Sequence, residues 1–244
     1  MLDQNLTKKE EYDLNKNAER GQQARSQKTR GLKRGLMWSG IFVVLIGAVW
    51  GLTKLSNNPG DIQEAVIISG VTAEDWVEGN KESQITLIEY GDFQCPACGA
   101  YFPLVEKLMD EHGDSFKFAY RHFPLQQHPN AKPAAYAAEA AGKQGKFWEM
   151  FDMIFVHQND WSGRTDAEDI FLQYAETLGL NIEQFKNDRD SDVVKEDVEK
   201  DYDSGVANKV NATPTFFLNG KKIQPRDYDE FVSLIEQASQ TDKN

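Results

Sequence analysis

The chain has 244 residues, of which 40% are hydrophobic and 11% aromatic, which is enough for one domain with a real core plus appendages. Its net charge of −12 is unevenly distributed: residues 1–34 hold nine Lys/Arg against five Asp/Glu, a net of +4, and the remainder holds 18 against 34, a net of −16. An acidic body argues against nucleic-acid binding, and a basic tail favours a position near anionic lipid head groups.

The N-terminal segment has two parts of opposite character. Residues 1–34 contain almost no large apolar residue, which predicts a disordered basic cytoplasmic tail. The run Leu36–Leu52 then carries no charge over 17 residues, with Trp38 and Trp50 near its two ends. Its length is at the short end for crossing a bilayer, and tryptophans are typical of membrane interfaces. We therefore expect a transmembrane signal-anchor over residues 35–54.

The charges beside this apolar run predict its orientation. Basic residues crowd the end of the tail, whereas Lys54 alone follows closely, so the N-terminus is expected in the cytoplasm and the body outside the cell membrane, with a single pass. Two alternatives stay open. A cleaved signal peptide would need small residues at a cleavage site, and residues 51–56 offer no good one. A buried core helix is less favoured because the run is apolar on every side.

A turn-rich linker over residues 55–65 is expected to precede a domain over residues 66–242. In that domain Val66–Ile68 predicts a short first strand, and Thr72–Trp76 predicts a surface turn or one helical turn. The β-branched, mostly apolar run Ile85–Tyr90 predicts a core strand.

The sequence Cys95-Pro96-Ala97-Cys98 follows this strand and opens a segment with apolar residues at helical spacing, which extends to about His112. Cys95 should lie at the N-terminus of that helix, where unpaired backbone N–H groups and the helix dipole favour a thiolate. Pro96 suits the first helical position because no N–H is needed there.

The chain has 2 cysteines in all, so pairing with each other is favoured. Their disulfide would close a very short loop and remove little chain entropy, which makes it a poor structural staple. A zinc site would need a second Cys/His pair, and the histidines are too scattered to provide one. A redox pair is therefore favoured, with a structural disulfide or chance thiols as the alternative. His122 and His128 are interpreted as structural, because nothing in the sequence places them near the cysteines.

The remainder of the chain alternates between strand and helix patterns. Phe116–Phe123 predicts a second core strand. A helical block from about 126 to 206 follows, beginning with an alanine-rich stretch of strong helix propensity. The expected helices start at Ala131 and Phe147 and cover 167–178, Ile182–Phe185 and Val193–Val206, the third capped by Thr165 or Asp166.

The strand pattern returns near the C-terminus. Ala212–Leu218 predicts a strand, and Asn219-Gly220 is a strong signal for a two-residue hairpin turn. Lys221–Ile223 would be the partner strand, and the apolar spacing from Tyr228 onward predicts a closing amphipathic helix.

This order of elements, over about residues 62–240, resembles the DsbA-like thioredoxin family of extracytoplasmic bacterial thiol–disulfide oxidoreductases. The resemblance rests on four segments: Asp92–Cys98, Arg121–Leu125, Gly145–Trp148 and Thr213–Phe216. It implies an α/β, thioredoxin-like fold with an inserted helical domain, here preceded by one N-terminal transmembrane helix. The sequence departs from the best-known member at Ala97, where a histidine stands between the cysteines.

The resemblance implies roles for individual residues. Cys95 would be the exposed nucleophile, Cys98 the buried resolving thiol, Pro214 a cis-proline against the disulfide, and Glu89 a buried acid beneath the pair. Independently, Glu89 is a carboxylate in an otherwise apolar strand, so burial should raise its pKa and suit it to proton transfer.

Client binding is expected beside the cysteines. A cis bond before Pro214 would expose the Thr213 backbone to an extended client chain, and Phe93 and Pro96 could line an apolar groove. We expect a disulfide oxidase for reduced or unfolded exported proteins, with no bound cofactor or metal. The resemblance implies reoxidation by a membrane quinone-linked thiol oxidase. The alternatives are a reductase or isomerase of the same fold, and a non-catalytic tethered chaperone or soft-metal-binding module.

Overall fold

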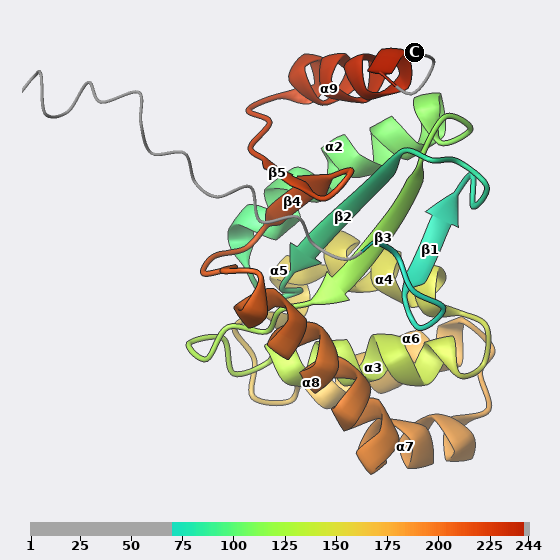
Figure 1. Cartoon of the computed structure of the whole chain (residues 1–244). Coiled ribbons are helices and arrows are strands. Elements are labelled where there is room, and N and C mark those ends of the chain that lie inside the picture. The colour runs from blue at the N-terminus through green and yellow to red at the C-terminus, as the bar shows by residue number, and fades with distance from the viewer. Residues whose placement is uncertain (1–69, 242–244) are drawn as a thin grey trace, which may run out of the picture. The chain divides into compact units, whose positions relative to one another are not determined.

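The computed structural model describes residues 70–241, all of which belong to the compact unit Gln63–Asn244 (Figure 1). The predicted tail, signal-anchor and linker and the predicted strand Val66–Ile68 lie outside the described residues. Across residues 70–241, no helix combines the length and the apolar character that a membrane crossing requires.

The described elements alternate as the sequence pattern predicts, with a helical block inserted between two β regions. In chain order they are β1 (Trp76–Gly79), β2 (Thr86–Gly91), α2 (Pro96–His112), β3 (Lys117–His122), α3 (Ala131–Gly142), α4 (Phe147–Val156), α5 (Gln158–Trp161), α6 (Ala167–Thr177), α7 (Ile182–Asp190), α8 (Asp192–Ala207), β4 (Thr215–Leu218), β5 (Lys221–Ile223) and α9 (Tyr228–Thr241).

The strands form a mixed sheet in the order β1-β3-β2-β4-β5. β2 and β3 are parallel, with Glu89 opposite Tyr120, and every other pair is antiparallel. The helix α2 provides the crossover that two parallel neighbours need. On its other side β2 pairs with β4, so that Glu89 also faces Phe216. β2 is therefore central, and its C-terminal end leads directly into the cysteine motif.

The sheet is buried on both faces, because successive side chains of a strand point to opposite sides. Leu87, Phe118 and Phe216 belong to the larger core, which includes residues of α2, α4 and α9. Ile88 and Phe217 belong to a smaller core on the other face, against which Tyr202 of α8 packs. In the view of Figure 1, α9 lies at the top and α3, α7 and α8 lie at the bottom.

Several local features differ from the predictions, including the strand β1, which was not expected. The turn predicted at Thr72–Trp76 ends earlier, since Asp75 accepts a hydrogen bond of 2.6 Å from the Thr72 N–H and Trp76 already begins β1. The short helix α5 was not expected, and α7 extends to Asp190 rather than ending at Phe185. These elements have little apolar periodicity of their own, so tertiary contacts decide their extent.

The predicted hairpin near the C-terminus is confirmed. Asn219 and Gly220 have φ angles of 47° and 79°, the left-handed values that a tight hairpin turn requires. The Asn219 side chain also accepts a hydrogen bond of 2.8 Å from the Thr86 N–H, which fastens the turn to the start of β2.

Candidate active site

The cysteine motif lies at the N-terminus of α2, at the end of the central strand. Cys95 is the N-cap residue and Pro96 is the first helical residue, as predicted. The Cys95 carbonyl accepts the helical hydrogen bond from Gly99 at 3.1 Å. Cys95 is 7% exposed and Cys98 is 1% exposed, and both are free thiols. Both residues are buried, Cys98 more completely, so the structure does not give Cys95 the exposure that the resemblance implied.

The surroundings of Cys95 favour its ionised form. A hydrogen bond from the Cys98 thiol is the largest influence, and it lowers the pKa of Cys95 to about 5 against the opposing effect of burial. The backbone N–H groups of Ala97 and Cys98, in the first helical turn, add smaller stabilisation. The un-ionised thiol instead donates to the Thr213 carbonyl at 3.4 Å, while the Thr213 hydroxyl has no partner and can donate to a thiolate.

The surroundings of Cys98 have the opposite effect. Burial raises the pKa of Cys98 well above its ordinary range, and the hydrogen bond to Cys95 and the charges of Glu89 and Cys95 raise it further. The Asp92 N–H donates to the Cys98 sulfur at 3.4 Å, which partly offsets this shift. One thiol is thus ready to ionise while its neighbour keeps its proton.

Glu89 lies in the middle of β2 and is 4% exposed. Burial raises its pKa to about 8, and the negative charge of Cys95 adds to the shift. A carboxyl group with this pKa is protonated at neutral pH, so it can give a proton to a sulfur atom and take one back. The structure thus gives Glu89 the burial expected from its place in an apolar strand.

The predicted client-binding residues separate into two groups. The Thr213–Pro214 peptide bond is cis, and the Thr213 carbonyl contacts the Cys95 sulfur. Pro96 is exposed beside it. Phe93, by contrast, is 1% exposed and packs at 4.9 Å from Phe155, measured between ring centroids. Its side chain belongs to the core and does not line a groove, because the strand end directs it inward among aromatic rings.

Sequence reasoning missed the side chains that hold the cysteine turn in place. The Gln158 amide of α5 donates to the carbonyls of Phe93 and Cys95 at 2.7 and 2.9 Å. It approaches closely because Gly99 has no side chain, and a Cβ there would lie 2.4 Å from the Gln158 oxygen. Gln94 in turn bonds the Ser162 carbonyl at 2.6 Å. No sequence motif marks a glutamine for such a role.

Comparison with known proteins identifies the fold and the family. A family model described as Thioredoxin matches residues 72–237. The chain belongs to the thioredoxin family. Oxidised BdbD from Bacillus subtilis is similar in structure, with a TM-score of 0.64 and 26% identity over 72% of this chain and 98% of that one. Wolbachia pipientis α-DsbA1 has the same fold, with a TM-score of 0.64, 18% identity and coverage of 70% and 94%.

These matches confirm the DsbA-like thioredoxin fold. Curated relatives include proteins named Na(+)/H(+) antiporter NhaA 1. The one from Mycolicibacterium gilvum is 36% identical over 209 residues, and the one from Salinispora arenicola is 36% identical over 202 residues. The alignments cover 83% and 75% of this chain but 33% and 30% of those proteins, so the chain spans about a third of their length.

The thioredoxin-family site contains two further buried polar groups that the sequence did not indicate. The Asp92 carboxylate accepts a hydrogen bond of 2.7 Å from His128, so this histidine lies closer to the cysteines than predicted. The Tyr120 hydroxyl has no hydrogen-bond partner and lies across Gly91, where a Cβ would be 2.6 Å from it. Within residues 70–241, His, Cys, Asp and Glu side chains form no group of three or more suited to a metal ion.

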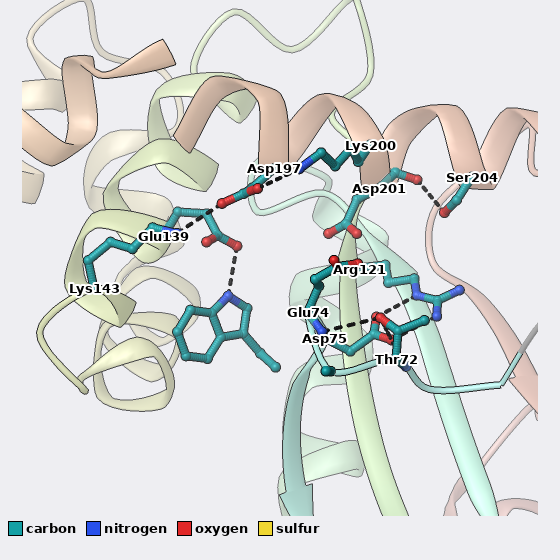
Figure 2. A pocket seen from close by; sticks show the side chains of 12 residues that line it. Thr72, Glu74, Asp75, Arg121, Glu139, Lys143, Asp197, Lys200, Asp201 and Ser204 are labelled. Atoms are coloured by element: carbon teal, nitrogen blue, oxygen red, sulfur yellow. Dashed lines mark hydrogen bonds and ion pairs between the residues drawn. The ribbon is translucent and has the colours of Figure 1, made fainter. Parts of the chain in front are cut away.

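A charged cavity of about 390 Å³ lies apart from the cysteines, between β1, α3 and α8 (Figure 2). Arg121 bonds Asp75 at 2.6 and 2.9 Å at its edge. Glu139 accepts hydrogen bonds of 2.7 Å from the Trp76 indole and 3.0 Å from His122. The Arg121–Asp75 pair and the Trp76–Glu139 hydrogen bond join β1 to β3 and α3, whereas the buried His122 Nδ1 has no partner.

Proposed function

We propose that this protein is a protein disulfide oxidoreductase, acting as an oxidase that transfers its Cys95–Cys98 disulfide to cysteines of exported proteins. The observation that carries the proposal is the contrast between the two thiols, with the pKa of Cys95 lowered to about 5 and that of Cys98 raised. A stabilised Cys95 thiolate makes the reduced form more stable and the disulfide correspondingly more oxidising. A thioredoxin-like reductase would lack this bias.

The exchange follows from the placement of the groups. A client thiolate attacks the Cys95 sulfur, the Cys95–Cys98 bond breaks, and Cys98 leaves with the electron pair and takes a proton from Glu89. A second client thiolate then attacks the client sulfur of the mixed disulfide and expels Cys95 as its stable thiolate. The client loses two electrons and the cysteine pair gains them. We infer that the Thr213 backbone aligns the extended client chain during both attacks.

Reoxidation and location complete the proposal. The reduced pair must return two electrons to an acceptor, and a membrane quinone-linked thiol oxidase is the class of partner that fits. The uncharged run Leu36–Leu52 supports a membrane tether with the catalytic domain outside the cell. Relatives named as antiporters are consistent with a thioredoxin-like segment near a membrane, but antiport itself is not proposed for this chain.

The redox equilibrium with glutathione tests the direction of transfer. We expect a reduction potential above about −200 mV, more oxidising than the roughly −270 mV of thioredoxin. A value near that of thioredoxin would instead favour the reductase alternative. Cys95→Ser should abolish disulfide transfer to a reduced client. In Cys98→Ala the Cys95 thiolate should attack the disulfide of an oxidised client, expel one client sulfur as a thiolate and stay joined to the other as a mixed disulfide, because no second thiol is present to release it. If Cys95→Ser still supported client oxidation, the assigned roles would be wrong.

Location is tested on the full-length chain in cells. A membrane-impermeant thiol reagent should label the reduced Cys95 in intact spheroplasts, and the protein should stay in the membrane fraction after a carbonate wash. Labelling that requires lysis would place the domain in the cytoplasm and contradict the proposal. Recovery of the intact domain in the medium would instead support a cleaved signal peptide.

A further inference from the structure

The Asp92 carboxylate is a buried charge directly beside the cysteine pair. Its side chain is 0% exposed. One oxygen accepts a hydrogen bond from the Gln94 N–H at 2.7 Å, and the other accepts from the Leu125 N–H at 2.9 Å and from His128 Nδ1 at 2.7 Å. Asp92 thus connects the start of α2 to the loop that follows β3.

The Asp92 backbone contacts both cysteines. Its N–H donates to the Cys98 sulfur at 3.4 Å, and its carbonyl accepts from the Cys95 N–H at 3.0 Å. The carboxylate therefore belongs to the same residue whose backbone positions Cys95 and Cys98. A fixed negative charge in such a buried place opposes the formation of a thiolate nearby.

His128 is the side chain that hydrogen-bonds this carboxylate. It donates Nδ1–H to Asp92, and its side chain is 19% exposed, so the pair leads from the protein surface to the buried carboxylate. His128 also lines a cavity of about 320 Å³ together with Leu125 and Tyr202. Lys132 and Glu199 line the same cavity, but they bond each other at 3.3 Å and are half-exposed.

We propose that Asp92 and His128 are a positioning pair that sets how readily the Cys95–Cys98 disulfide is reduced. Asp92 holds Cys98 and opposes the Cys95 thiolate through its charge, and His128 offsets that charge. This inference rests on the proposed role of Cys95 as the thiol that ionises. Other ionisable groups near the site are Glu89, Tyr120, Lys132 and Glu199, and they are left unchanged in the critical variants.

The test compares two substitutions that an electrostatic role and a purely structural role affect differently. His128→Gln removes the group that offsets the charge, so the ionisation midpoint of Cys95 should rise by about one pH unit. Asp92→Asn removes the charge but keeps an oxygen acceptor, so the midpoint should fall. Loss of structural support alone would loosen the helix start in both variants and move both midpoints upward. The signs therefore distinguish the two roles.

The measurement is the thiolate absorbance of the reduced full-length chain in detergent as the pH is varied, together with the glutathione equilibrium constant. That constant should change by up to about tenfold per unit of midpoint shift, in opposite directions for the two variants. The matched control is Lys132→Gln, which removes a charge from the same cavity without contacting Asp92 and should shift the midpoint by no more than a few tenths of a unit.

A second comparison keeps the inference testable if Asp92→Asn does not fold. His128→Lys places a cationic donor beside Asp92 and should keep the midpoint close to that of the wild type, whereas His128→Gln should not. Midpoint shifts of the same sign in the Asp92 and His128 variants, or no shift, would overturn the inference. An unmodified protein whose Cys95 ionises only near the ordinary pKa of a thiol would instead overturn the proposed function.

Discussion

Two polar regions of this molecule manage burial in opposite ways. Beside β1, Arg121 and Asp75 are 5% and 4% exposed and form a two-bond ion pair, so each charge has its partner. Beside the cysteines, Glu89 is kept neutral by burial, and the hydroxyls of Tyr120 and Thr213 have no partner. The first arrangement stabilises the fold. The second leaves groups free to respond when a charge appears on sulfur.

The largest expected effect comes from removing one partner of the Arg121–Asp75 ion pair. Asp75→Asn removes one charge of a buried ion pair and leaves Arg121 uncompensated, so the free energy of unfolding should fall by about 3–5 kcal/mol. Urea unfolding of the reduced protein measures this. Because the pair lies away from the cysteines, the ionisation midpoint of Cys95 should not change.

The matched control for this prediction is Asp166→Asn. Asp166 pairs with Arg164 at 2.6 Å, but the two side chains are 47% and 55% exposed. Solvent screens exposed ion pairs, so this variant should unfold almost like the wild type. If Asp75→Asn shifted the Cys95 midpoint, the two regions would be coupled and the comparison would be wrong.

The next effect comes from the region beside the cysteines, where a substitution is expected to raise stability. The pKa of Glu89 is about 8 in the folded chain and near 4.5 when the chain is unfolded, so its contribution to stability is full below pH 4.5 and declines as the pH rises to about 8. Gln cannot ionise in either state. Glu89→Gln should therefore be more stable than the wild type at pH 8, by about 2–4 kcal/mol, while disulfide transfer slows by about a hundredfold.

Glu106→Gln is the control for Glu89→Gln. Burial and the charge of Asp152 raise the pKa of Glu106 to about 7, yet this carboxyl lies further along α2. Its removal should also relieve a destabilised carboxylate at pH 8 but leave the transfer rate unchanged. Equal slowing in both variants would show that the effect comes from α2 as a whole and not from proton transfer by Glu89.

Much of the architecture can be predicted from the sequence. The strand, the cysteine motif, the helix start and the Asn219-Gly220 turn are local patterns, and they predict most of the architecture and the place of Cys95 and Cys98. The strand β1 was missed because it is only 4 residues long and ends in glycine. Its position depends on Trp76, which bonds Glu139 at a separation of 63 residues.

The supporting residues of the site could not be predicted for the same reason. The Asp92–His128 bond joins residues 36 positions apart, and the Gln158–Cys95 bond joins residues 63 positions apart. Only the folded chain brings such pairs together. A buried aspartate at a strand end is one available signal, because its charge requires donors from somewhere else in the chain.

A smaller effect concerns the difference in stability between the reduced and the oxidised Cys95–Cys98 pair. The pKa of Cys95 is about 5 in the fold and near 9 in the unfolded chain, so the thiolate contributes stability above pH 9 that is lost as the pH falls through 5. The disulfide adds little stability to the oxidised form because it closes a short loop. At pH 7 the reduced form should be more stable by about 1–2 kcal/mol, allowing for solvent near the sulfur.

Thermal unfolding of the reduced and oxidised proteins measures this difference at a series of pH values. The stability difference between the reduced and the oxidised protein should narrow from pH 7 toward pH 5. Once Cys95 is protonated, the oxidised protein should be the more stable form. An oxidised form that is the more stable at pH 7 would contradict the stabilised thiolate and, with it, the oxidase proposal.

The smallest effect concerns the connection between the helical block and the cysteine turn. Gln158→Ala removes the two amide hydrogen bonds to Phe93 and Cys95, so the free energy of unfolding should fall by about 1–2 kcal/mol. Amide exchange should become faster in the first turn of α2, since the Gln158 amide no longer holds the carbonyls at the start of that turn. Gln184→Ala, which removes an exposed bond to Asp188 of 3.2 Å, is the matched control and should have almost no effect. If the first turn of α2 exchanged at the same rate in both variants, the helix start would be held by Asp92 and Gln94 alone, and the contribution of α5 to the site would be negligible.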